Sequence, residues 1–250
     1  MKEKINKIVS SKNFHVYVVT VIILFIIFVA LVISLKYTVE GEKDLPFDLF
    51  KISAISSVEG QNVQDEEHKW NLSVSQNNDI YLYIKKNDNY KDTEVIKSIE
   101  VENIKATRTG KKGIEKIYKP DSSLQNSFFS ATSENEVDKV EYIGDLSSDI
   151  KNLKISNQGG LVVFRYALNE LGNYISDDDV EINHNDLLKK IDIKNEDIQL
   201  KLSFDLIINL DSDKSYKSTV ELDLPVGNVI DEGVQSMEYT DLSNIVFKRL

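Results

Sequence analysis

The densest group of side chains that could do chemistry lies between residues 177 and 186. The potential metal ligands there are Asp177, Asp178, Asp179, Glu181, His184 and Asp186. Carboxylate oxygens are ligands that Ca²⁺ prefers, but a calcium-binding loop sets them around a tight turn that usually contains Gly. No Gly occurs in this segment. We therefore interpret it as a solvated acidic loop and predict no metal site.

Catalytic motifs are scarce in the rest of the chain. The chain has no Cys, which excludes thiol catalysis and Cys-ligated metal centres. None of its three histidines, His15, His68 and His184, belongs to an H-E-x-x-H pattern, and no G-x-S-x-G or phosphate-binding loop pattern occurs. We predict no catalytic residue and no cofactor. A hydrolase or carbohydrate-active domain stays open as an alternative, because a pair of Asp or Glu residues can meet only in the fold.

Two tyrosines are the candidate binding residues. Tyr81 and Tyr83 alternate with Ile80, Leu82 and Ile84, so on a strand they face away from these apolar side chains. Such a pair could form an exposed strip that binds glycan or protein. The alternative is that both rings cover the second side of a central strand, because aromatic residues are common in strands.

The stretch Leu161–Leu168 is apolar on both faces apart from Arg165. This pattern predicts a strand in the middle of a sheet, covered on both sides. A cation buried there needs a carboxylate partner, so we expect Arg165 to form a structural ion pair.

Strands must position all of these residues, because the dominant hydrophobic period is two. Two alternating runs, Ile198–Leu210 and Tyr216–Leu224, predict a long antiparallel hairpin with one wet face. An earlier hairpin is predicted with its turn at Gln76–Asp79, and a long loop is predicted over Asp121–Glu136. Short strands between Gly, Asn and Asp turns predict a mainly β fold, an antiparallel β-sandwich.

The stretch Val16–Leu35 holds 20 residues and no charge. As a helix it is about 30 Å long, which matches the hydrocarbon core of a bilayer. Four lysines and one Glu precede it, a net charge of +3, and the positive-inside rule places that end in the cytoplasm. A cleaved signal peptide would have a shorter apolar run and a small-residue cleavage site, so we predict an uncleaved, single-pass signal anchor.

The predicted order is therefore a cytoplasmic tail (1–15), a transmembrane helix (16–35), a polar stalk (36–46) and an extracytoplasmic β-sandwich domain (47–250). One sandwich and two small sandwiches in tandem both remain open, and we favour one because no linker divides the region. The chain carries −11 overall and hence −14 after residue 15, which argues against nucleic acid as a partner.

Two segments, YTVEGEKDLPF (Tyr37–Phe47) and LDLPVGNVIDEG (Leu222–Gly233), resemble those of a group of uncharacterised bacterial single-pass membrane proteins. The similarity extends over most of the chain. It implies an anchored topology and a bacterial source. It implies no catalytic or binding residues, because that group has no assigned activity.

These observations predict a membrane-anchored binding or scaffold protein of the bacterial cell envelope. Its partners would be the lipid bilayer, through the N-terminal helix, and a protein or cell-wall component outside. Besides the hydrolase, a Ca²⁺-dependent adhesion module is an alternative. The sequence identifies neither the outside partner nor the oligomeric state.

Overall fold

The computed structural model describes residues 12–66, 69–121, 128–129, 135–147, 152–176 and 183–250, with the backbone alone for residues 12–13, 64–66 and 69. The chain divides into two units, one ending at Lys43 and the other running from Asp44 to Leu250. Each unit is described by itself.

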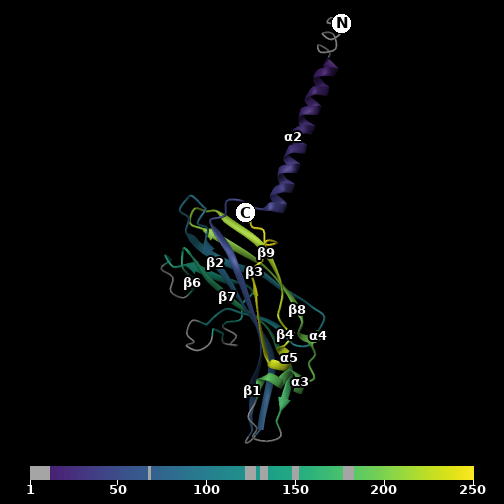
Figure 1. Ribbon diagram of the computed structural model, residues 1–250, viewed down its shortest axis with the longest axis vertical. Helices are drawn as coiled ribbons and strands as arrows, with labels where there is room; N and C mark the ends of the chain where they lie inside the picture. Colours follow the sequence, from purple (N-terminus) through teal and green to yellow (C-terminus); the bar gives the residue numbers. More distant parts are fainter. Residues whose placement is uncertain (1–11, 67–68, 122–127, 130–134, 148–151, 177–182) are drawn as a thin grey trace. The chain divides into compact units, whose positions relative to one another are not determined.

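Helix α2 (Lys12–Glu40) makes up most of the first unit (Figure 1). Its stretch from Phe14 to Glu40 is long and apolar enough to cross a membrane, a property that an N-terminal signal sequence shares. The hydroxyl of Thr20 donates to the carbonyl of Val16 at 2.9 Å, so this polar group is satisfied within the helix. The helix also continues through residues 36–40, the first part of the predicted stalk.

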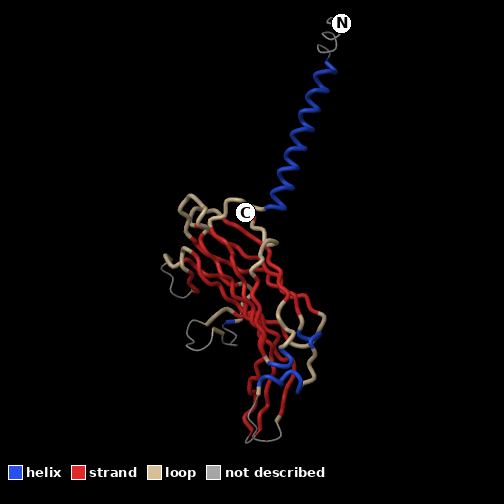
Figure 2. Tube along the Cα trace, in the orientation of Figure 1, coloured by secondary structure: helices blue, strands red, loops and turns tan. Residues whose placement is uncertain are grey.

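The second unit is built from two β-sheets (Figures 1 and 2). Among the described residues, the first sheet has the strand order β10-β1-β2-β7-β4. Its strands are β1 Phe47–Glu66, β2 Lys69–Lys86, β4 Ile114–Tyr118, β7 Gly159–Ile175 and β10 Val234–Tyr239. The second sheet has the order β11-β9-β8-β3-β5-β6. Its strands are β3 Ile96–Arg108, β5 Val140–Gly144, β6 Leu153–Ile155, β8 Leu200–Leu210, β9 Ser215–Asp223 and β11 Lys248–Arg249.

The core lies between the inner faces of the two sheets. Phe164 of β7 and Phe204 of β8 are both buried, and their rings meet edge to face with centroids 5.2 Å apart. Burying each such ring stabilises the fold by roughly 1.5–3 kcal/mol. The predicted late hairpin is confirmed, because β8 and β9 pair antiparallel with Leu202 opposite Leu222. The predicted fold class, an N-terminal helix and a mainly β domain of two sheets, is also confirmed.

The turn predicted at Gln76–Asp79 is wrong, because β2 runs through it without a break. The polar side chains that suggested a turn are largely buried and bind partners on β1, β2 and β7 instead. Asn78 accepts hydrogen bonds from Ser56 at 2.6 Å and from Gln76 at 3.3 Å, and its Nδ2 donates to the carbonyl of Tyr166 at 3.1 Å. These long-range partners lie on β1 and β7, so local turn propensity could not reveal them.

A group of short helices, most of them beside β1 of the first sheet, adds buried side chains to the core. They are the 3₁₀ helix η2 His184–Asp186, α3 Leu187–Lys190, α4 Asn195–Ile198 and α5 Val229–Glu232. An added Cβ on Gly60 of β1 would lie 3.0 Å from both Leu187 and Leu72, so helix and strand pack closely there. Leu187 and Leu188 belong to the same buried cluster as Phe164 and Phe204.

Tyr142 of β5 ties the two sheets together. Its hydroxyl donates to the carbonyl of Val163 in β7 and accepts from the N–H of the same residue, both at 3.0 Å. Burial raises the pKa of the Tyr142 phenol to about 12, against the opposing effect of the backbone hydrogen bond. One side chain in the second sheet thereby satisfies two backbone groups of the first.

Candidate binding surface

Tyr81 and Tyr83 lie on the outer face of the first sheet. Their neighbours Ile80, Leu82 and Ile84 are buried in the core, so the predicted alternation is confirmed. Both tyrosines are half-buried. Their role as binding residues stays a prediction.

A β-bulge in β1 adds two side chains to this face. The register with β2 shifts between Leu49 and Lys51. Leu49 and Ile52 are both buried, whereas Phe50, between them, is exposed. The rings of Phe50 and Tyr83 meet edge to face at 6.0 Å, and Lys51 Nζ lies 4.3 Å from the centre of the Tyr83 ring. A cation over a ring at this distance is attracted by its π-electrons.

Tyr81 is covered in part by the predicted long loop. Its ring meets that of Phe128 edge to face with centroids 6.3 Å apart. It also packs against a small second cluster of buried side chains, Tyr118, Phe129, Val163 and Ala167. Burial raises the pKa of the Tyr81 phenol. Of the predicted loop, residues 122–127 and 130–134 lie outside the described residues.

We call Phe50, Tyr81, Tyr83 and Phe128 the aromatic strip. Phe50 and Phe128 are exposed, so the strip presents ring surface to solvent. Sequence reasoning missed Phe50, because strict alternation puts it on the same side of the strand as the buried Ile52. Only the bulge moves it outward, and bulges have no strong local sequence signature without a Gly.

The ion pair predicted for Arg165 is confirmed beside the strip, with Asp79 as the partner. Arg165 Nε and Nη2 donate to the two carboxylate oxygens of Asp79 at 2.6 and 3.0 Å. Both side chains are largely buried, and the guanidinium lies 4.5 Å from the centre of the Phe129 ring. Burial raises the pKa of the Asp79 carboxyl more than Arg165 lowers it, and the nearby Glu59 adds to the rise.

The outer face of the second sheet carries a different arrangement, which we call the polar network. It consists of Ser98, Glu100, Asn103, Asp205, Asn209, Ser215, Lys217 and Thr219. Asn209 donates to Ser98 at 3.0 Å and to Glu100 at 2.9 Å, and it accepts from Ser215 at 2.6 Å. These polar groups therefore satisfy one another along β3, β8 and β9.

Asp205 is the centre of the other half of the network. It accepts hydrogen bonds from Thr219 at 2.6 Å and from Asn103 at 2.8 Å, and Lys217 Nζ lies 2.8 Å away. Burial alone would raise the pKa of the Asp205 carboxyl, but the hydrogen bonds from these three groups outweigh burial and hold the pKa below its usual value.

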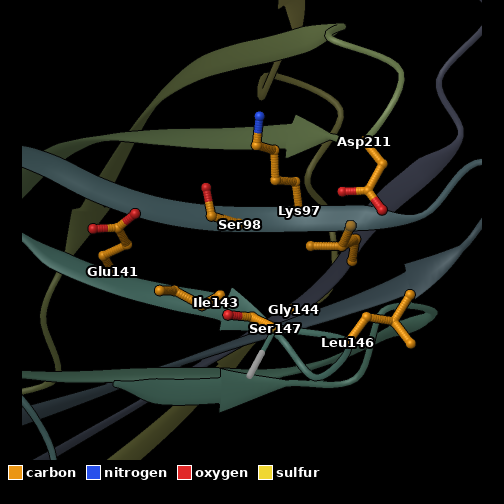
Figure 3. Close-up of a pocket in the computed structure, with 9 residues that line it drawn as sticks. Lys97, Ser98, Glu141, Ile143, Gly144, Leu146, Ser147 and Asp211 are labelled. Carbon is orange, nitrogen blue, oxygen red and sulfur yellow. The ribbon is translucent and has the colours of Figure 1, made fainter. Parts of the chain in front are cut away.

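A shallow groove of about 420 Å³ opens beside the network between β3 and β5 (Figure 3). Ile96, Ile143 and Leu146 give it apolar walls. Its two carboxylates, Glu141 and Asp211, lie at opposite ends of the groove in Figure 3. Lys97 lies on the strand between them.

The acidic segment considered for Ca²⁺ lies largely outside the described residues, since 177–182 belong to the undescribed ranges, as does His68. His184, which is described, accepts a hydrogen bond from the N–H of Gly60 through Nδ1 at 3.4 Å. Among the described residues, no group of three or more acidic or His side chains is placed to hold a metal ion.

Comparison of the chain with protein-family models, with curated proteins and with solved structures finds no match. The resemblance to bacterial single-pass proteins therefore stays an expectation from the sequence.

Proposed function

We propose that this chain is a single-pass membrane protein of the bacterial cell envelope whose β-domain binds a protein or cell-wall partner outside the cytoplasm. The observation that carries the proposal is the contrast between the two outer faces of the domain. One face has polar groups that satisfy one another. The other presents rings, Phe50 and Phe128, that stay exposed although each contacts a neighbouring tyrosine.

The anchor supports the location. Helix α2 is long and apolar enough to span a membrane, and the sequence before it has a net charge of +3. The positive-inside rule then puts the domain from Asp44 onward outside. The domain has no Cys, so its stability outside depends on the core and not on disulfides.

The aromatic strip supports the binding role. Aromatic side chains are enriched where proteins bind partners, because they offer large contact area at a low cost in side-chain entropy. Phe50 is 44% exposed, and Tyr83 next to it is held by Phe50 and Lys51. A ring held in place loses less freedom when a partner packs on it.

The location is tested on membranes from cells that express the full chain. We expect the chain to stay in the membrane after an alkaline carbonate wash. We expect protease added to spheroplasts to cut the domain and to spare the N-terminal tail. Release by carbonate, or a domain that the protease cannot reach, overturns the location.

The binding role is tested with a photo-crosslinking amino acid introduced at Tyr83 in the full chain. The matched control carries the same amino acid at Glu221, an exposed position on the outer face of the second sheet. We expect defined adducts from the Tyr83 position and none from Glu221. Equal adduct patterns from both positions count against the aromatic strip as the binding face.

A hydrolase or carbohydrate-active domain is the second candidate, and the groove between β3 and β5 is the observation that favours it. Glu141 and Asp211 are the carboxylates available there. The purified chain would then cleave cell-wall glycan, and Glu141→Gln would abolish the cleavage. Equal product release by wild type and this variant removes the groove as an active site.

A further inference from the structure

Among the described residues, the β-domain has four sheet edges, and two of them, both on the second sheet, are poor sites for an added strand. One edge is β6, with three residues. At the other, the two residues of β11 cover Tyr216 and Lys217 of β9. The rest of β9 carries Glu221 and Asp223, charged side chains that disfavour pairing with another strand. Short edge strands offer too few backbone groups to pair with another chain. These two edges are therefore poor places for a partner strand.

The third edge, at β4, is covered by the chain itself. The N–H of Val137 donates to the carbonyl of Ile117, and the N–H of Lys119 donates to the carbonyl of Asn135, both at 3.0 Å. Tyr118 and Glu136 form an antiparallel bridge between these two bonds. The segment 135–137 thus occupies the free side of β4 at residues 117–119, and the uncovered part, Ile114–Lys116, is too short to pair well with another strand.

The fourth edge is β10, Val234–Tyr239, and it is open. One side of it pairs with Ile52–Ser57 of β1. Among the described residues, the backbone groups on its other side bind no further segment. The strand contains no Pro and no Lys, the residues that commonly block edges. Val234 and Met237 are 48% and 42% exposed.

We propose that β10 pairs antiparallel with β10 of a second copy of this chain across a two-fold axis, so that two five-stranded sheets become one. In an antiparallel pair, opposite residues both direct their backbone groups toward the partner strand or both away from it. In a symmetric pair, one residue must therefore lie opposite its own copy, and the two-fold axis runs between these two copies. A symmetric contact of this kind is the commonest form of self-association.

Side-chain complementarity places the axis at Met237. Met237 then lies opposite its own copy, and its exposed side chain becomes buried. Ser236 lies opposite Glu238, and Gln235 lies opposite Tyr239, so like charges never face each other. An axis at Glu238 would set two carboxylates against each other.

The anchor strengthens this contact, and this step rests on the proposed membrane location. Two copies held in one membrane meet at a raised effective concentration, so a modest strand-to-strand contact suffices. The pairing through β10 itself does not depend on the anchor.

Cysteine crosslinking tests the contact, because the chain has no Cys of its own. Directly opposed residues in antiparallel strands have Cα atoms about 4.5–5.5 Å apart, which suits a disulfide. Met237→Cys in the full chain, in liposomes under mild oxidation, should form a covalent dimer at least about tenfold faster than a control. The control is Ile114→Cys, at a 47% exposed apolar position on edge strand β4, which the proposal leaves outside the contact.

A second variant keeps the test independent of thiol chemistry. Met237→Lys sets two positive charges opposite each other, so light scattering in detergent should report a monomer where wild type is a dimer. Ile114→Lys should remain a dimer, and circular dichroism should show both variants folded. Equal crosslinking at positions 237 and 114, a monomeric wild type, or a dimer that Met237→Lys leaves intact overturns the proposal.

The outcomes separate this proposal from the membrane location. A chain that resists carbonate but is monomeric refutes the β10 contact alone. A chain that carbonate releases but that still crosslinks through position 237 refutes the anchor alone.

Discussion

The two outer faces of the β-domain both come from alternating strands, but the side chains on them make different kinds of contact. On the second sheet, the Asp205 carboxylate is also largely buried, but it binds Lys217 and Thr219, which are themselves partly or fully exposed to water. On the first sheet, Arg165 and Asp79 are shielded beside Phe129, with the aromatic strip next to them. The polar side chains of one face therefore bind one another, whereas the other face keeps ring surface exposed to solvent.

The largest expected effect is on the shielded ion pair of the first sheet. Arg165→Leu leaves the Asp79 carboxylate largely buried without its partner, so the free energy of unfolding should fall by about 3–5 kcal/mol. Urea denaturation of the full chain in detergent measures this. The double variant Arg165→Leu, Asp79→Leu removes both charges and should recover part of the loss. A loss below about 1 kcal/mol for the single variant would contradict the shielding of this pair.

A smaller effect is expected on the second sheet. Asp205→Ala removes the acceptor of hydrogen bonds from Asn103 and Thr219, but those donors can turn to water. The loss should be about 1–2 kcal/mol after allowance for solvent screening. Glu221→Ala, an exposed position on the same face, is the control and should change little. A loss as large as that of Arg165→Leu would erase the contrast between the faces.

The two carboxylates should also respond to pH with opposite sign. The pKa of Asp205 is held below its value of about 3.9 in the unfolded chain, so its stabilisation is present above pH 4 and is lost as pH falls through the folded pKa. The pKa of Asp79 is raised, so its contribution is fully present below about pH 3.9 and is lost as pH rises through the folded pKa.

Unfolding free energies measured from pH 2 to 7 check this difference. Asp205→Asn should lessen the loss of stability on acidification, and Asp79→Asn should increase it. Slopes that change in the same direction for both variants would show that the two faces do not differ in this way.

The smallest effect on stability is expected at the aromatic strip. Tyr83→Ala removes contacts with Phe50 and Lys51 at a half-buried position, and we expect a loss below about 1 kcal/mol. The same variant should lose most of the partner capture. Thermal unfolding and adduct yield, with the crosslinker placed at Phe50, measure the two quantities separately. A large loss of stability with capture unchanged would make the strip a structural feature only.

Period-two alternation was enough to place Tyr81 and Tyr83 on one side of their strand and to pair β8 with β9. The need of Arg165 for a carboxylate also followed from its apolar neighbours. Asp79 as the partner did not follow, because it lies 86 positions away on a different strand. Pairings across such distances depend on the sheet order, which local patterns do not encode.

The failure at Gln76–Asp79 has a related cause. A run of Gln, Asn and Asp usually marks a turn, but here Ser56 and the carbonyl of Tyr166 supply buried partners, and the strand continues through the run. Phe50 shows the same limit, since its exposure depends on a register shift against β2. Local sequence predicts the backbone well, except where partners on a distant strand bind the polar side chains or shift the register.

Among the described residues, the hydroxyl of Tyr142 takes the place of a neighbouring strand beside Val163. β4 pairs with β7 only from Arg165 to Asn169, so Val163 lies beyond its reach. The amide of Val163 nevertheless has an acceptor, the Tyr142 oxygen of the other sheet. Its hydrogen should therefore exchange slowly with deuterated solvent for as long as the sheets stay together, which makes this one amide a reporter of their separation.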